Sequence, residues 1–148
     1  MIGVALAIHV LAVVVWVGGM AFTHFALRPA LTETLEPPQR LKVLAAILQR
    51  FLGAVTLAVG LIILSGGYLL ASTPAYARSP AVHIMLALGV VMAIVFAYVR
   101  WRSYPRLREA VQAARWPDAG AAANTIRHLV DVNLALGAVV VVVAIFGR

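Results

Sequence analysis

Residues 2–27 read IGVALAIHVLAVVVWVGGMAFTHFAL, and this opening stretch decides the fold class. It holds no Asp, Glu, Lys or Arg, and it exceeds the roughly 20 apolar residues that a helix needs to cross the hydrocarbon layer of a bilayer. Three later stretches are similarly apolar: residues 51–72, 81–99 and 128–146. A segment inside lipid must pair its own backbone polar groups, so all four are predicted to be helices. We therefore expect one all-α domain over residues 1–148, a four-transmembrane-helix bundle surrounded by a lipid bilayer.

The composition agrees with a membrane protein and narrows the chemistry. Hydrophobic residues make up 64% of the 148 residues and charged residues only 11%, whereas about a quarter of a soluble domain is charged. This balance excludes a soluble catalytic domain. Cysteine is absent, which excludes disulfides, thiolate-bound zinc, iron–sulfur clusters and covalently attached c-type haem. A bound metal must then rely on His, Met, carboxylate or carbonyl ligands.

The basic residues are sorted between the two ends of the predicted helices. Ten of the twelve lie in the connections Arg28–Arg50 and Arg100–Arg127, while the other ends carry only Arg78 and Arg148. The positive-inside rule then places both long connections in the cytoplasm and both termini outside. The expected location is the bacterial inner membrane. The net charge of +7 flanks apolar segments, so no nucleic acid partner is expected.

Both long connections contain a short amphipathic stretch, Pro38–Arg50 and Arg106–Trp116. Apolar and basic residues alternate there at helical spacing, which predicts short helices lying on the anionic inner leaflet. Small residues in the spans predict close helix packing. Gly53 and Gly60 share one helix face and are expected to form such a seam.

The four histidines all lie in or at the ends of the predicted spans, where polar side chains usually turn towards a partner or a cofactor. Spans one and three run in the same direction, so His9 and His83 are expected near the outer surface. We predict that this pair ligates the iron of one haem b. His24 and His128 lie roughly 22 Å deeper, at 1.5 Å per residue, and form a weaker second pair that would hold a second haem.

Further residues surround the predicted haem. Trp16 and Met20 share a helix face with His9 and would wall the porphyrin, and ordinary packing is the alternative for such a stripe. Arg78 would meet a haem propionate, or else is a solvated loop arginine. Asp131, the one acid inside a span, would pair with Arg127 or hydrogen-bond a histidine.

The stretch HVLAVVVWVGGMAF, from His9 to Phe22, followed by Arg28-Pro29, resembles the first helix of the small stand-alone members of the CopD-like family of bacterial membrane proteins. Similarity to the third helix, the cytoplasmic loop and the fourth helix is found in HIMLALGVVM from His83, in Tyr104-Pro105-Arg106-Leu107, and in IRHLVDVNLALG from Ile126 to Gly137. The His-x6-Trp-x-Gly-Gly pattern is also similar, more loosely, to the haem-binding HemJ proteins.

The resemblance implies either copper handling or haem chemistry. Beyond Met1 the chain has only Met20, Met85 and Met92 and no Met-rich external loop, which favours haem. HemJ activity itself is not expected, because no lysine follows His83. The sequence is therefore interpreted as a membrane b-type cytochrome, an oxidoreductase that exchanges electrons with a quinone or a small oxidant such as superoxide. The alternative is a copper-handling membrane protein without redox enzyme activity. A homodimer is a further expectation.

The charge asymmetry generates a topology prediction. Reporter fusions placed after Arg148 should behave as extracytoplasmic, and a cysteine introduced at Ala75 should react with an impermeant reagent added to intact cells. A cysteine at Glu36 is the matched control and should react only after permeabilisation. Labelling with the opposite pattern would reverse the orientation.

Overall fold

The computed structural model describes residues 1–147, and four helical rods make up nearly all of this part of the chain. The rods are Ile2–Thr34, Pro37–Ser72, Pro80–Gln112 and Trp116–Phe146, each long and apolar enough to cross a membrane. The predicted all-α fold with four transmembrane helices is therefore confirmed.

Two rods are continuous helices and two are assembled from three pieces. The continuous ones are α3 (Pro37–Ser72) and α7 (Trp116–Phe146). The first rod consists of α1 (Ile2–Phe22), the π-helical turn η1 (Thr23–Leu27) and α2 (Arg28–Thr34). The third consists of α5 (Pro80–Tyr98), the π-helical turn η2 (Val99–Ser103) and α6 (Tyr104–Gln112). A short helix, α4 (Pro74–Arg78), lies between α3 and α5.

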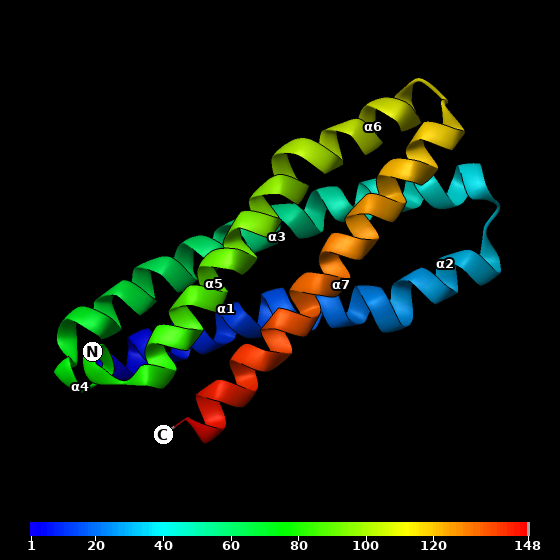
Figure 1. The fold of residues 1–148 in the computed structure, drawn as a ribbon. Helices are drawn as coiled ribbons and strands as arrows, with labels where there is room; N and C mark the ends of the chain where they lie inside the picture. Colours follow the sequence, from blue (N-terminus) through cyan, green and yellow to red (C-terminus); the bar gives the residue numbers. More distant parts are fainter. Residues whose placement is uncertain (148) are drawn as a thin grey trace.

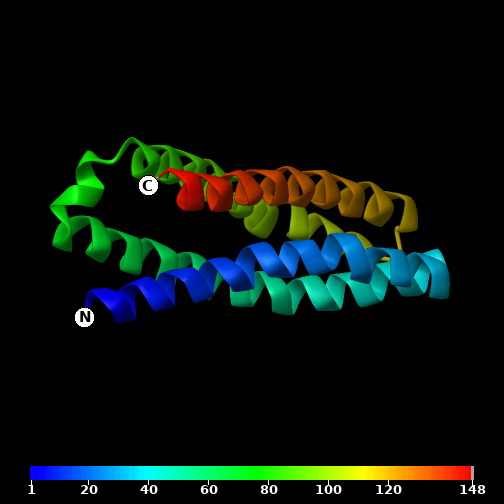
Figure 2. The same ribbon diagram turned by 90° about the horizontal axis from the view of Figure 1, so that it is seen from below.

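The rods lie side by side in two layers, with α1 beside α3 and α5 beside α7 (Figures 1 and 2). The N-terminus, α4 and the end of α7 lie at one end of the bundle, and the α2–α3 and α6–α7 connections lie at the other (Figure 1). The two connections that carry most of the basic residues are thus at the same end.

The two amphipathic stretches are helical as predicted, but the expected location on a leaflet is wrong because both pack inside the protein. Residues 38–50 are the first turns of α3, and α6 continues the third rod. Their apolar stripes are buried inside the protein: Leu48 is 2% exposed and Leu107 is fully buried. Tyr104 also donates a hydrogen bond to the carbonyl of Ala45 over 3.2 Å. Burial against neighbouring helices satisfies the same amphipathic pattern that a lipid surface would.

The first and third rods share one architecture. Each is 33 residues long, contains a five-residue π-helical turn, and has a proline as the second residue of the segment after that turn, Pro29 or Pro105. Proline lacks an N–H and its ring collides with the carbonyl four residues earlier. The wider π-helical turn absorbs this defect without breaking the rod.

Close helix approach depends on Gly19 and Gly137. A Cβ on Gly19 would lie 2.3 Å from the ring of Phe51, and one on Gly137 would lie 2.9 Å from Val17. The seam predicted at Gly53 and Gly60 is wrong for this chain, because a Cβ at either position would meet nothing within 4 Å. Gly53 and Gly60 do lie on one face of α3, but that face is turned away from the other helices.

The α6–α7 turn is a Schellman motif with an unusual residue at its left-handed position. The N–H of Arg115 bonds the carbonyl of Ala110, and that of Ala114 bonds the carbonyl of Val111. Ala114 has φ 54°, a conformation that glycine adopts at much lower cost. Arg115 reinforces the turn by ion pairs of 3.0 Å with Glu109 and with Asp118.

Replacement of Ala114 by glycine should stabilise the protein by about 1 kcal/mol, because it removes the steric strain of a left-handed Cβ. The measurement is the free energy of unfolding in detergent micelles titrated with a denaturing surfactant. Ala113→Gly is the matched control and should be neutral or destabilising, since Ala113 has φ −85°. Destabilisation by Ala114→Gly would contradict the assignment of steric strain to the left-handed backbone of Ala114.

Candidate functional site

His9 is held by the neighbouring helix α3. Its Nδ1 lies 3.0 Å from the Oγ of Ser65, and its Cε1 lies 3.1 Å from the position a Cβ on Gly66 would take. The hydroxyl of Ser65 already donates to the carbonyl of Leu61. The Ser65 oxygen can therefore accept a hydrogen bond from Nδ1 of His9 in the tautomer that carries its hydrogen there.

His83 lies on the exposed surface at the start of α5. Its Nδ1 donates to the carbonyl of Ser79 over 2.8 Å, within the first turn of its own helix. Among residues 1–147 no hydrogen bond or ring contact joins His83 to His9. The structure thus attaches these two histidines to different partners, and their shared ligation of a haem stays a prediction.

His24 is paired with Asp131, which joins η1 to α7. The Nδ1 of His24 lies 2.6 Å from one carboxylate oxygen of Asp131, and the Nε of Arg127 lies 3.8 Å from the other. Both roles considered for Asp131, an ion pair along the helix and a bond to a histidine, are therefore found together. His128 is exposed, so the carboxylate and not His128 is the group that the fold brings to His24.

The predicted stripe of Trp16 and Met20 lies at the centre of the bundle. Trp16 is 5% exposed and Met20 is 2% exposed, and Trp16 meets Phe96 of α5 edge-on at 5.9 Å between ring centroids. Asn133 of α7 is also buried and donates to the carbonyl of Met92 over 3.2 Å. Arg78, by contrast, is an exposed residue in the last turn of α4.

Ser65 is the residue of this arrangement that the sequence reasoning missed. It is the one buried serine of α3, in a span that otherwise consists almost entirely of hydrocarbon side chains and glycines. The position of Ser65 directly before Gly66 was the available signal, because a glycine leaves room for a ring from the next helix.

Three of the histidines have Nδ1 within hydrogen-bond distance of an oxygen: the hydroxyl of Ser65 for His9, the carboxylate of Asp131 for His24 and the carbonyl of Ser79 for His83. A histidine that ligates a metal through Nε2 is usually oriented by such a bond at Nδ1. The described part of the chain contains no group of three His, Asp or Glu placed to hold one metal ion.

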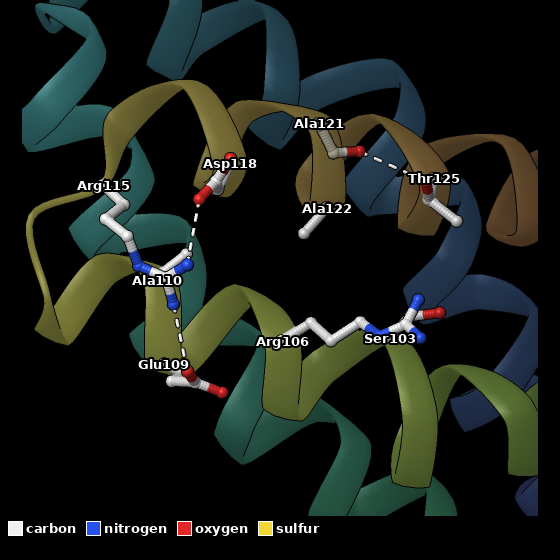
Figure 3. A pocket seen from close by; sticks show the side chains of 9 residues that line it. All are labelled: Ser103, Arg106, Glu109, Ala110, Arg115, Asp118, Ala121, Ala122 and Thr125. Atoms are coloured by element: carbon white, nitrogen blue, oxygen red, sulfur yellow. Dashed lines mark hydrogen bonds and ion pairs between the residues drawn. The ribbon is translucent and has the colours of Figure 1, made fainter.

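A cavity of about 390 Å³ opens between α6 and the start of α7 (Figure 3). The ion pairs of Arg115 with Glu109 and Asp118 close one side, and Arg106 extends towards Ser103 at the other (Figure 3). None of the residues predicted from the sequence to form a site lines this cavity. Three of the charged side chains that line the cavity, Glu109, Arg115 and Asp118, are paired with one another. This pairing indicates that they hold the α6–α7 turn in place.

Removal of the His24 imidazole should cost stability because it leaves one carboxylate oxygen of Asp131 without its hydrogen-bond partner. We expect His24→Ala to lower the free energy of unfolding by about 1 to 3 kcal/mol, the usual cost of a charge-assisted hydrogen bond. His128→Ala is the control, and as an exposed substitution it should stay within about 0.5 kcal/mol of the wild type. Strictly additive effects of His24→Ala and Asp131→Ala in a double-mutant cycle would show that the pair does not interact.

Comparison with known proteins identifies one family. The family described as CopD, copper resistance protein D, matches residues 45–146, which extend from within α3 to the last turn of α7. This match supports the CopD resemblance and does not support one to HemJ. No curated protein and no solved structure matches the chain. The family match covers about two thirds of the sequence, and the chain therefore belongs to the copper resistance protein D family of multi-pass inner-membrane proteins.

Proposed function

We propose that this protein handles copper within the membrane, with the metal as its cargo and not as a resident cofactor. The observation that carries the proposal is the match to the copper resistance protein D family across α3 to α7. Copper handling was the alternative at the level of sequence, and the family match now favours it over the cytochrome interpretation.

The proposed copper contacts lie on the inward side of the first rod. His9, Met20 and His24 occupy three successive depths, and imidazole and thioether groups are both accepted by copper. His9 and His24 are separated by roughly 22 Å along the helix axis, which is most of the hydrocarbon thickness. The carboxylate of Asp131 beside His24 would offset the positive charge of a passing ion.

The proposed orientation places the His9 end outside and the His24 end in the cytoplasm. Its support is the clustering of ten of twelve basic residues in the two connections found at one end of the bundle (Figure 1). Under this orientation His9 is the outer copper contact and His24 the inner one.

Haem b remains the competing proposal. It requires Nε2 of His9 and of His83 to face one porphyrin, with Trp16 and Met20 as walls and Arg78 at a propionate. The ring of His9 packs against α3, whereas His83 is exposed on α5, and this placement is a poor fit to a shared planar cofactor. Electron exchange with a quinone or superoxide depends on that haem and has no other support.

Copper binding to the purified protein tests the proposal directly. Detergent-solubilised wild type dialysed against copper and then against buffer should retain the metal, measured by elemental analysis, and His9→Ala or His24→Ala should retain less. Ser65→Ala and Asp131→Ala should weaken binding by about tenfold, because each removes the oxygen that orients a ring through Nδ1, and the second also removes the carboxylate charge beside His24. His128→Ala is the control and should bind as the wild type does.

The visible spectrum of the same preparation decides between the two proposals. A haem-free protein that binds copper would agree with the copper proposal. A Soret band that disappears in both His9→Ala and His83→Ala, in a wild type that retains no copper, would overturn it in favour of the cytochrome.

A further inference from the structure

The cavity between α6 and the start of α7 contains one cation that has no counterion (Figure 3). The volume of this cavity, about 390 Å³, is within the range of roughly 300 to 1,000 Å³ that is usual for small-molecule sites. One end is closed by the ion pairs of Arg115 with Glu109 and Asp118. Arg106 also lines the cavity, and within the described part of the chain it forms no ion pair with Asp or Glu.

Ser103 is a buried polar residue beside that cation. It is 3% exposed and lines the cavity, and the side chain of Arg106 extends towards it (Figure 3). Hydroxyls elsewhere in the helices donate to the carbonyl four residues earlier, as that of Thr125 does to Ala121. Ser103 ends the π-helical turn η2, where the backbone repeat is wider, and among residues 1–147 its hydroxyl makes no such bond. A hydroxyl and a guanidinium are thus both available to a ligand at this end of the cavity.

The charges at the two ends of the cavity select a ligand of mixed charge. A guanidinium presents its N–H groups as a fork that matches two oxygens of a phosphate or carboxylate, and a serine hydroxyl adds a further donor. At the other end, the two negative charges of Glu109 and Asp118 face the single positive charge of Arg115. That end is therefore net negative. The complementary ligand is a zwitterion, with an oxyanion at Arg106 and a cation near the two acids.

The basic end of the cavity lies at the depth of the lipid headgroups. Ser103 is four residues past the predicted span 81–99, which places it roughly 6 Å beyond the hydrocarbon at 1.5 Å per residue. Thr125, on the facing wall, is three residues before the span 128–146 and thus roughly 5 Å beyond it. The headgroup layer on each side of a bilayer is about 5 to 8 Å thick. Glu109 lies ten residues past the first of these spans, roughly 15 Å out, and therefore faces water.

We propose that this cavity binds the phosphoethanolamine headgroup of a phospholipid in the leaflet at the basic end of the bundle, which is the cytoplasmic leaflet in the proposed orientation. The phosphate of such a headgroup lies next to the hydrocarbon and its primary ammonium lies further out. The cavity has the matching order, with Arg106 nearer the hydrocarbon and the acids beyond it. Val132, seven residues after Thr125 on the same face of α7, is 52% exposed and offers a surface to an acyl chain. This inference goes beyond copper handling and does not depend on it.

Arg108 supplies a matched control for Arg106. It lies two residues further along α6, it is exposed, and it does not line the cavity. Residues two apart point to different sides of a helix. Arg106→Gln and Arg108→Gln thus remove the same charge at nearly the same depth, and only the first alters the cavity. A general attraction between cations and a lipid surface would respond equally to both substitutions.

The experiment titrates the full chain in detergent with phosphatidylethanolamine, phosphatidylglycerol or phosphatidylcholine and counts bound lipid by native mass spectrometry. Wild type should bind phosphatidylethanolamine about tenfold more tightly than the other two, because phosphatidylglycerol has no cation and the quaternary ammonium of phosphatidylcholine has no N–H to donate. Arg106→Gln should weaken this binding by about tenfold, and Arg108→Gln should leave it unchanged. Glu109→Gln should reduce the preference for phosphatidylethanolamine over phosphatidylglycerol, whereas a mere loosening of the turn would weaken both lipids equally.

Equal binding of the three lipids, or equal losses in Arg106→Gln and Arg108→Gln, would overturn the site. Soluble glycerophosphoethanolamine should displace the bound lipid, because recognition lies in the headgroup, and its failure to do so would overturn headgroup recognition. Binding of the soluble compound without binding of the lipid would overturn the lipid as the source of the ligand. The thermal midpoint of each variant is measured in parallel. If Arg106→Gln does not fold, Ser103→Ala decides, and it should weaken the binding of phosphatidylethanolamine several-fold.

Discussion

Backbone hydrogen bonds cannot be left open in hydrocarbon, and this constraint governs the whole bundle. The chain meets it with four rods, but Pro29 and Pro105 each remove a donor from a rod that must remain continuous. The π-helical turns η1 and η2 accommodate the two prolines. A turn that contains an extra residue also rotates the following helix face by about 100°, so these turns determine which side chains face inward beyond them.

The placement of His24 illustrates this dependence. It lies inside η1, and its Nδ1 reaches Asp131 on α7, which is far away in sequence. The equivalent turn in the third rod precedes Tyr104, whose hydroxyl reaches the carbonyl of Ala45. In both rods the π-helical turn is thus followed or accompanied by a polar bond to another helix at the same end of the bundle.

Three hydrogen bonds of polar side chains hold neighbouring helices together and also fix how those side chains are oriented. Ser65 with His9, Asp131 with His24, and Asn133 with the carbonyl of Met92 each join two helices. The first two also orient an imidazole ring through its Nδ1. The family match begins at residue 45 and does not include the first rod, which carries His9, Met20 and His24. The family assignment therefore does not extend to the proposed ligands, which rest on the first rod alone.

The sequence by itself determined the helical class, the four spans, the sorting of charge between the two ends and the depth of each histidine. These properties follow from composition and from the fixed rise of a helix along its axis. Only the tertiary structure decided which side chains meet: His24 with Asp131 instead of His128, His9 with Ser65, and residues 38–50 with α6 instead of a lipid surface. Depth can be read from residue number, but the direction in which a side chain points around the axis depends on the π-helical turns and on which helices become neighbours. Those choices are made by packing across the whole bundle, which no local pattern encodes.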